Sequence, residues 1–308
     1  MRILVAGNTG LAGRAIYERL RSSNCNVIGL NSKVVDLLDQ KATLDFLMDN
    51  RPDIVIDAAA YVGGIAANDS QPVSFLSRNV LMQTHLMNAS HAANVNRLLF
   101  LGSSCIYPRN CPQPIKEEYL LSGYLERSNS AYAIAKIAGV ELVKAYRKQY
   151  KREWISIMPC NLYGPHDNFN LETGHVLPAL VNKFVSAVDR GVNKVEIWGS
   201  GNPRREFLHV SDLAEAVVIV LEKYNEDSHL NIGFGSDISI RELAEKIATI
   251  SNFRGEISWN SNKPDGVERK VLDVSRITSL GWKPKVALDE GISSTIDWFR
   301  GNSREARL

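Results

Sequence analysis

Short apolar runs alternate with amphipathic stretches along the first half of the chain. The apolar runs lie at 3–6, 27–30, 54–59, 98–102 and 155–159. The helical patterns lie near 14–22, 40–49 and 75–93, and a further one holds Tyr132 and Lys136. Such alternation is typical of βαβ units. The pattern therefore predicts an α/β fold built on a doubly wound parallel sheet.

The pattern of apolar and polar positions changes after about residue 165. Loops dominate there, with a helix expected near 176–188, a short strand at 195–198 and a helix near 210–222. We expect a Rossmann domain over 1–165 and a smaller C-terminal α/β substrate-binding lobe over 166–308. Segments at about 200–225 are candidates to return to the first domain. The cleft between the two parts is the expected ligand site.

Composition narrows the class of protein. The 308 residues are 44% apolar and carry a formal net charge of +2 without a block of like charge, which argues against nucleic acid or a membrane as the main partner. The first apolar run is too short for a secretory signal, so we expect a cytoplasmic enzyme. The four cysteines show neither metal-ligand spacing nor a disulfide pattern, and we expect no metal.

A glycine-rich loop follows the first apolar run directly and opens the first helix. It reads Gly7, Asn8, Thr9, Gly10, Leu11, Ala12 and Gly13. This spacing allows a tight turn, close approach of the backbone to a pyrophosphate, and phosphates at the positive end of a helix. The loop predicts a dinucleotide site.

The residues after the second apolar run indicate which dinucleotide is bound. An Asp or Glu there would bind a ribose 2′-hydroxyl, whereas this chain has Asn31, Ser32 and Lys33. A cation and two small hydrogen-bonding groups suit a 2′-phosphate, which favours NADP(H) over NAD. The alternative is that Lys33 is an ordinary solvated lysine.

Three residues suggest hydride chemistry. Tyr132 and Lys136 stand one helical turn apart, and the ammonium is expected to lower the pKa of the phenol so that it can exchange a proton with a substrate oxygen. Ser103 lies at a predicted strand end, where its hydroxyl can reach the same oxygen. Cys105 follows two positions later, so both side chains point to the same side if the segment is extended.

At these residues the chain resembles the extended short-chain dehydrogenase/reductases, and the resemblance implies that Ser103, Tyr132 and Lys136 are catalytic. Within that family it is similar to the GDP-L-fucose synthases over nearly its whole length. The stretches that carry the similarity are 7–13, 60–65, 102–108, 132–139, 161–169, 205–210, 263–266 and 280–282. The chain departs from this pattern at Thr9, Cys160 and Lys183, which affects expected affinities rather than the reaction type.

The resemblance implies roles for further residues. Cys105 and His175 would act as base and acid in epimerisation at C3 and C5 of a GDP-4-keto sugar, before NADPH reduces C4. The implied cofactor contacts, beyond the residues already named, are Asp36, Leu37, Leu101, Gly102, Ser104, Pro159, Asn161, Leu162 and His175. The implied contacts to the GDP-sugar are Lys183, Trp198, Arg205, Asp265 and Lys270. Arg204 competes with Arg205, and a homodimer is expected from the family.

Other functions stay open at this point. The chain could be a C4 reductase of another GDP-4-keto sugar with partial or no epimerisation, although the presence of Cys105 and His175 argues against it. A 4,6-dehydratase would carry an Asp-Glu pair where this chain reads Ser104, Cys105 and Ile106. A cofactor sensor without turnover would need no intact triad.

Overall fold

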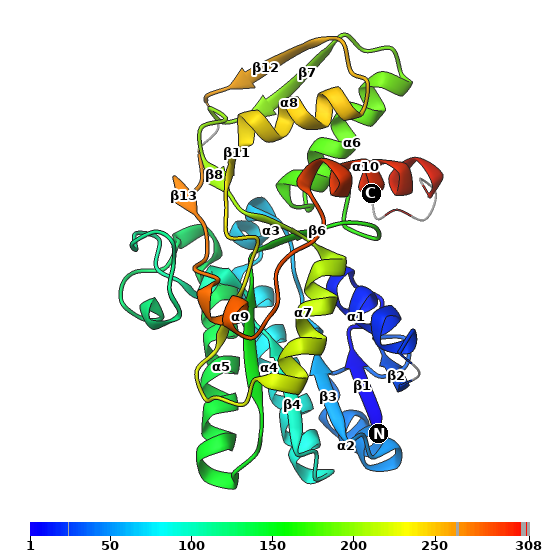
Figure 1. The fold of residues 1–308 in the computed structure, drawn as a ribbon, viewed down its shortest axis with the longest axis vertical. Coiled ribbons are helices and arrows are strands. Elements are labelled where there is room, and N and C mark those ends of the chain that lie inside the picture. Colours follow the sequence, from blue (N-terminus) through cyan, green and yellow to red (C-terminus); the bar gives the residue numbers. More distant parts are fainter. Residues whose placement is uncertain (24, 263–264, 303–305, 307–308) are drawn as a thin grey trace.

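The computed structural model describes residues 1–23, 25–262, 265–302 and 306 (Figure 1). Its main sheet has six parallel strands in the order β10-β5-β4-β3-β1-β2. They are β1 (Arg2–Ala6), β2 (Asn26–Leu30), β3 (Ile54–Asp57), β4 (Arg97–Leu101), β5 (Ile155–Pro159) and β10 (Leu230–Ile232). The predicted doubly wound α/β fold is confirmed. Within the described ranges, no helix has the length and apolar character needed to cross a membrane.

The strands of this sheet are apolar because both of its faces are covered. Ile3, Leu4 and Val5 in β1 are at most 1% exposed. The register aligns Ala6 with Leu30 on one side and with Asp57 on the other. The chain reverses its direction of sheet growth at β1, between β2 and β3. The loops after these three strands therefore meet at one edge, where ligands bind in doubly wound sheets.

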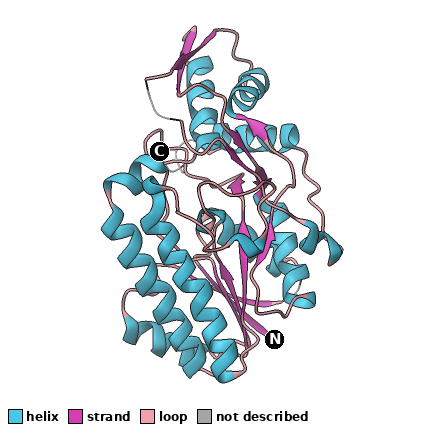
Figure 2. Ribbon diagram, turned by 90° about the vertical axis from the view of Figure 1, so that its left-hand side faces the viewer, coloured by secondary structure: helices cyan, strands magenta, loops and turns pink. Residues whose placement is uncertain are grey.

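Helices cover the sheet on both sides, and long ones stand beside it in Figure 2. They are α1 (Leu11–Arg21), α2 (Gln40–Asn50), α3 (Ile65–Ser70), α4 (Pro72–Ala92), α5 (Ser130–Tyr150), α7 (Val210–Lys223) and α9 (Ser275–Ser279). α4 packs against α2 and α5, whereas α1 packs against α7. Gly139 lets α5 approach β4, because a Cβ there would lie 2.4 Å from the Phe100 ring. This close approach fixes the height of Tyr132 and Lys136 above the sheet.

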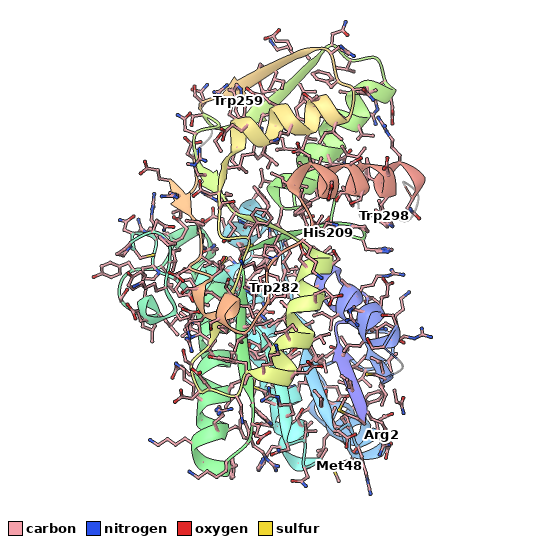
Figure 3. All side chains as sticks on the ribbon, viewed as in Figure 1. Arg2, Met48, His209, Trp259, Trp282 and Trp298 are labelled. Carbon is pink, nitrogen blue, oxygen red and sulfur yellow. The ribbon has the colours of Figure 1, made fainter. Side chains whose placement is uncertain are left out.

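A smaller lobe lies above the sheet in Figure 1. It contains α6 (Val176–Asp189), α8 (Ile240–Ile250) and α10 (Leu288–Gly301) around the parallel pair β7 (Lys194–Trp198) and β12 (Glu256–Asn260). Phe169, Phe184 and Ile247 belong to its own buried core. Figure 3 shows Trp259 on β12 at the far end of this lobe from Arg2 and Met48.

Short strands join the two parts. β6 (Asn161–Tyr163) pairs with β9 (Phe207–His209), and β8 (Arg204–Arg205) lies between β11 (Ile238–Ser239) and β13 (Arg269–Lys270). His209 lies at the junction in Figure 3. The sequence analysis did not predict these strands, nor α3, α8, α9, α10, β10 and β12. The short strands and helices carry little periodicity. In contrast, α8 and α10 are long and amphipathic, so their apolar positions were an available signal.

The core around the main sheet includes residues from the C-terminal half of the chain, and these extend beyond the expected segments near 200–225. Leu213 and Val217 of α7 are buried in that core, and so are Leu230, Leu272 and Trp282. β10 completes the edge of the main sheet. The chain therefore crosses between the two parts several times, and each crossing passes the edge where the loops meet.

Candidate active site

The glycine loop has the geometry that its spacing predicts. Gly7 adopts a φ of +78°, and a Cβ there would lie 2.7 Å from the Ala58 carbonyl oxygen. A Cβ at Gly13 would lie 2.2 Å from the Gly7 carbonyl oxygen, so α1 and the loop can pack together only without side chains. Gly10 precedes α1 and offers no side-chain cap, which leaves the backbone N–H groups of the first turn free for an anion.

The residues after β2 lie at the same edge. The Asn31 amide nitrogen donates to Asn8 Oδ1 at 3.1 Å, and Asn31 Oδ1 accepts the Lys33 backbone N–H at 3.0 Å. Lys33 is exposed and has no ion pair within the described ranges. Its charge is therefore available to a ligand at the loop.

The first turns of α5 carry Tyr132 and Lys136. The Lys136 Nζ atom donates to the Leu101 carbonyl oxygen at 2.8 Å and lies 5.9 Å from the Tyr132 ring centroid. Leu101 is the last residue of β4, so this bond joins the helix to the strand that leads to Ser103. The two side chains thus share one side of α5, as the four-residue spacing predicts.

The electrostatics of this pair differ from the expectation. Burial raises the pKa of Tyr132 well above its ordinary range instead of the ammonium lowering it. Burial also lowers the pKa of Lys136 to about 8, against an opposing effect of Asp57. The expected lowering of the Tyr132 pKa is therefore wrong for the protein without ligands, because removal from water outweighs the lysine charge.

Asp57 is a buried carboxylate at the end of β3 that the sequence analysis did not select. It is 1% exposed, its Oδ1 accepts the Ala59 N–H at 3.2 Å, and its Oδ2 has no partner among the described residues. Burial raises its pKa to about 6, and Lys136 opposes that rise. The sequence signal that could have identified Asp57 is an acidic residue at the end of an otherwise apolar run.

The segment after β4 is not extended. Ser104–Ile106 forms a 3-10 turn, and Ser103 Oγ accepts the backbone N–H of Cys105 at 3.2 Å. The condition under which alternation would place the Ser103 and Cys105 side chains on the same side is therefore not met, because a serine before a turn bonds to it locally. Since the Ser103 oxygen accepts this bond, its own proton is free for a ligand oxygen.

Cys105 lies where β4, α5 and the smaller lobe approach one another. The Asn129 amide nitrogen lies 3.4 Å from the Cys105 sulfur. Cys105 and Lys270 line one small hollow, which also includes Arg269 and Glu126. The sulfur also acts electrostatically on Arg205 and Tyr132. The structure thus brings Cys105 close to residues that the sequence assigns to different roles.

His175 follows a segment that contacts residues near Tyr132. It precedes α6 without capping it. The Gly64 backbone N–H donates to the Thr173 carbonyl oxygen at 2.8 Å, just before His175. A Cβ on Gly63, beside Gly64, would touch Phe75, whose ring meets Tyr132 edge-on at 6.3 Å between centroids. Although His175 is exposed, the protein atoms around it lower its pKa.

The remaining residues of the implied substrate set form two groups. Lys183 donates to the Glu196 carbonyl oxygen at 2.8 Å, and its Nζ lies 5.8 Å from the Trp198 ring centroid. Asp265 accepts hydrogen bonds from the backbone and hydroxyl of Ser200. Lys263 and Pro264, in the matching stretch before Asp265, lie outside the described residues. The first group lies on α6 and β7 and the second at the loop after β7.

Arg204 and Arg205 differ in their partners. Arg204 forms ion pairs with Asp237 and Glu242, which hold its guanidinium away from a ligand. Arg205 donates to the Arg204 carbonyl oxygen at 2.8 Å, has no ion pair within the described ranges, and is influenced by Cys105 and Asp265. The geometry therefore favours Arg205 as the cation available to a substrate.

The other implied cofactor residues occupy the strand ends and loops around the same edge. Asp36 and Leu37 lie between β2 and α2, and Leu37 is buried. Leu101, Gly102 and Ser104 follow β4, whereas Pro159, Asn161 and Leu162 lie at the end of β5 and in β6. Asn161 donates to the Glu206 carbonyl oxygen at 2.8 Å. A single ligand along the carboxyl ends of β1, β4 and β5 could contact all three groups.

Residues 3–233 match the model of the NAD dependent epimerase/dehydratase family. The chain belongs to that family. Within it, the chain is 46% identical to the GDP-L-fucose synthase of Sinorhizobium fredii, over 98% of this chain and 96% of the relative.

Two solved structures of family members resemble the whole chain. A GDP-L-fucose synthetase from Naegleria fowleri bound to NADP has a TM-score of 0.92 and 31% identity, covering 100% of this chain and 96% of that one. A GDP-6-OMe-4-keto-L-xylo-heptose reductase from C. jejuni has a TM-score of 0.91 and 33% identity, with 97% of both chains covered.

Proposed function

We propose that this chain is an NADPH-dependent enzyme that converts GDP-4-keto-6-deoxy-D-mannose to GDP-L-fucose by epimerising C3 and C5 and then reducing the C4 ketone. The observation that carries the proposal is the position of Cys105: its sulfur lies 3.4 Å from the Asn129 amide at the start of the helix that carries Tyr132, and it lines one hollow with Lys270. The 46% identity to a GDP-L-fucose synthase supports the same reaction.

The residues after β1 and β2 fit NADP(H). The first turn of α1 has free N–H groups, and Gly10 leaves room for a close anion, since a Cβ there would meet only the Gly7 carbonyl oxygen at 3.5 Å. Lys33, exposed beside Asn31, would pair with a 2′-phosphate. Bound here, the cofactor supplies the hydride for C4.

The epimerisation needs a base and an acid on opposite faces of the sugar. We assign Cys105 as the base: its thiolate takes the proton from the carbon beside the ketone, and the electron pair stays on the substrate as an enolate. His175 is the acid that returns a proton to the other face. A lowered pKa makes its protonated form a stronger acid. The free Ser103 hydroxyl and Tyr132 hold the enolate oxygen.

The reduction uses the same oxygen. Tyr132 keeps its phenolic proton, because burial raises its pKa, and can pass it to the C4 oxygen as the ketone becomes an alcohol. Lys136, tied to the Leu101 carbonyl, holds a positive charge beneath the ring and favours the phenolate that remains. One oxygen site would serve both stages.

Cations of the smaller lobe would bind the GDP. Arg205 is free of carboxylate partners within the described ranges and suits two-point contact with a phosphate. Lys270 lies across the hollow from Cys105, and Lys183 lies beside the exposed Trp198 ring. Asp265 would accept hydroxyl groups of the sugar or ribose.

The chain is further proposed to form a homodimer through α4 and α5. Leu81 of α4 and Ile134 of α5 are 45% and 48% exposed, respectively, on helices that pack against each other. Exposed apolar side chains on two adjacent helices favour pairing with a second copy. Light scattering of the protein and of Leu81→Lys measures the state, and a monomeric wild type contradicts the proposal.

The test is turnover of GDP-4-keto-6-deoxymannose with NADPH in deuterated water. We expect GDP-L-fucose that carries deuterium at C3 and C5. Reduced product without those labels contradicts the epimerase half and favours a simple C4 reductase. The matched variant Cys105→Ser should still bind NADPH but lose labelled product, and unchanged turnover removes Cys105 from the mechanism.

A further inference from the structure

The start of α5 contains an asparagine that does not do what its position suggests. Asn129 is the residue before the helix, and Asn is among the best residues for accepting a first-turn N–H there. The Asn129 side chain caps no N–H of α5. By contrast, Ser239 at the start of α8 accepts the Glu242 N–H at 3.1 Å. The Asn129 side chain is therefore turned away from its own helix.

The side chain is turned towards the sulfur of Cys105. Its Nδ2 lies 3.4 Å from Sγ, within hydrogen-bond range for sulfur, and donates to it. Its Oδ1 is buried and has no partner among the described residues. Within the described part of the chain, the contact with sulfur is thus the only hydrogen bond of this side chain. Buried side-chain amides usually satisfy both ends.

Donor groups and cations lie around the sulfur, together with the Glu126 carboxylate in the same hollow. The N–H of Asn129 faces it from one side, and the positive end of α5 begins at the same residue. The Arg205 guanidinium interacts with it from the smaller lobe. A donor amide near a sulfur stabilises the thiolate more than the neutral thiol, because a hydrogen bond to a charged acceptor is stronger.

We propose that Asn129 is a positioning residue for the epimerisation: its amide holds the Cys105 sulfur in place and stabilises the thiolate that takes the substrate proton. Asn129 acts through Cys105, so its catalytic part rests on the proposed function. The effect of Asn129 on the Cys105 sulfur does not depend on the proposed function, and it can be measured without a sugar substrate.

The first experiment measures alkylation of Cys105 by iodoacetamide at one fixed pH in the NADPH-bound protein. Modification of Cys25, Cys111 and Cys160 is subtracted with Cys105→Ser. We expect the rate to fall about 10-fold or more in Asn129→Ala, since a hydrogen bond to a charged group is lost. It should fall further in Asn129→Asp, whose carboxylate has the same shape but repels a thiolate.

The order of these variants separates a positioning role from a structural one. Asp is as good a helix-starting residue as Asn, so a purely structural role predicts that Asn129→Asp behaves as the wild type. Ser239→Ala is the matched control: it removes a real cap, and should lower thermal stability while leaving the Cys105 alkylation rate unchanged. Alkylation of Asn129→Asp at the wild-type rate overturns the proposal.

The second experiment follows deuterium wash-in at C3 and C5 with NADP+ in place of NADPH, so that no reduction occurs, and separately measures NADPH oxidation with a 4-keto sugar already epimerised at C3 and C5. In Asn129→Ala the wash-in rate should fall about as much as the alkylation rate, while reduction of the epimerised sugar and the KM for NADPH stay unchanged. Equal loss of both activities overturns the catalytic part. If the alkylation order holds while no protein forms GDP-L-fucose, the proposed function fails and the action on the sulfur stands.

Discussion

Two buried polar clusters lie at opposite ends of the segment from Ser103 to Tyr107. The site cluster comprises Asp57, Cys105, Asn129, Tyr132 and Lys136. Two of its buried atoms, Asp57 Oδ2 and Asn129 Oδ1, have no partner within the described ranges. The second cluster, the Tyr107 network, comprises Tyr107, Glu117, His229 and Asn231, and none of its side-chain atoms is left in that condition.

The Tyr107 network is saturated. The Tyr107 hydroxyl donates to Asn231 Oδ1, so it can only accept from His229 Nε2 at 3.0 Å, which fixes the tautomer of that ring. The Asn231 side chain donates to the Ile115 carbonyl oxygen, and Glu117 accepts the Asn231 backbone N–H. These bonds tie β10 to the loop after β4.

The difference separates two uses of buried polarity. A cluster that only holds the fold completes its hydrogen bonds, because an orphaned buried group lowers stability. The site cluster leaves atoms unpaired and shifts the pKa values of Asp57 and Lys136 towards neutrality. Such groups gain partners when a ligand binds. Changes in the Tyr107 network should therefore affect stability, and changes in the site cluster should affect activity.

The largest expected effect is on activity, at Tyr132. Tyr132→Phe removes the proton donor, and C4 reduction should fall about 100- to 10,000-fold. Thermal stability should hold or rise, because among the described residues the Tyr132 hydroxyl makes no hydrogen bond that the change would remove. NADPH consumption and a melting curve measure the two effects. A variant that unfolds earlier but turns over normally would reverse the assignment of the two clusters.

The next effect is on stability, at Asn231. Asn231→Ala removes the side-chain hydrogen bonds to the Tyr107 hydroxyl, the Ile115 carbonyl and the Asp273 carbonyl, and should lower the free energy of unfolding by about 3 kcal/mol. Activity per folded molecule should persist. Asn193→Ala, at an exposed position, is the control and should change stability by less than about 0.5 kcal/mol. Urea unfolding decides between these outcomes.

A smaller effect depends on pH. Burial lowers the pKa of His229 to about 4, so between pH 4 and 6.5 the unfolded chain binds a proton that the folded protein does not. Stability from this group is therefore lost as the pH falls, by about 2 kcal/mol between pH 6.5 and 5. His229→Gln keeps a donor for Tyr107 but does not titrate, and should flatten this part of the stability profile. An unchanged slope would place the acid sensitivity elsewhere.

The smallest expected effect is on cofactor choice, at the exposed residue Lys33. Lys33→Glu should lower kcat/KM with NADPH about 10-fold and leave NADH use equal or better, because a carboxylate repels the 2′-phosphate. Lys148→Glu, an exposed charge reversal on α5, should change neither. Efficient use of NADH by the wild type would contradict the argument from Lys33.

Much of the fold was predictable because its signals are local. The apolar runs of β1, β3, β4 and β5 are largely buried, and the glycine loop can exist only where Gly7 and Gly13 pack without side chains. The spacing of Tyr132 and Lys136 fixed their common side of α5. The resemblance to known enzymes added Cys105 and His175, which spacing could not have joined.

The hydrogen-bond and ion-pair partners of each side chain could not be predicted from the sequence. Asn129 would be read as a helix cap, and only the structure turns it to Cys105. Arg204 and Arg205 are adjacent, and their roles are separated by Asp237 and Glu242, more than thirty residues later, which bind the first. The turn at Ser104–Ile106 also depends on a local hydrogen bond that competes with extension.

The sequence by itself thus determined the doubly wound sheet, the dinucleotide loop and the types of reactive groups, since these follow from periodicity and from residues a few positions apart. The tertiary structure alone decided which polar atoms are satisfied and which pKa values shift. The burial and the hydrogen bonds of each group depend on residues that the fold brings together from β3, β4, α5 and the smaller lobe. These residues are distant in the sequence, so no local pattern predicts their combined effect.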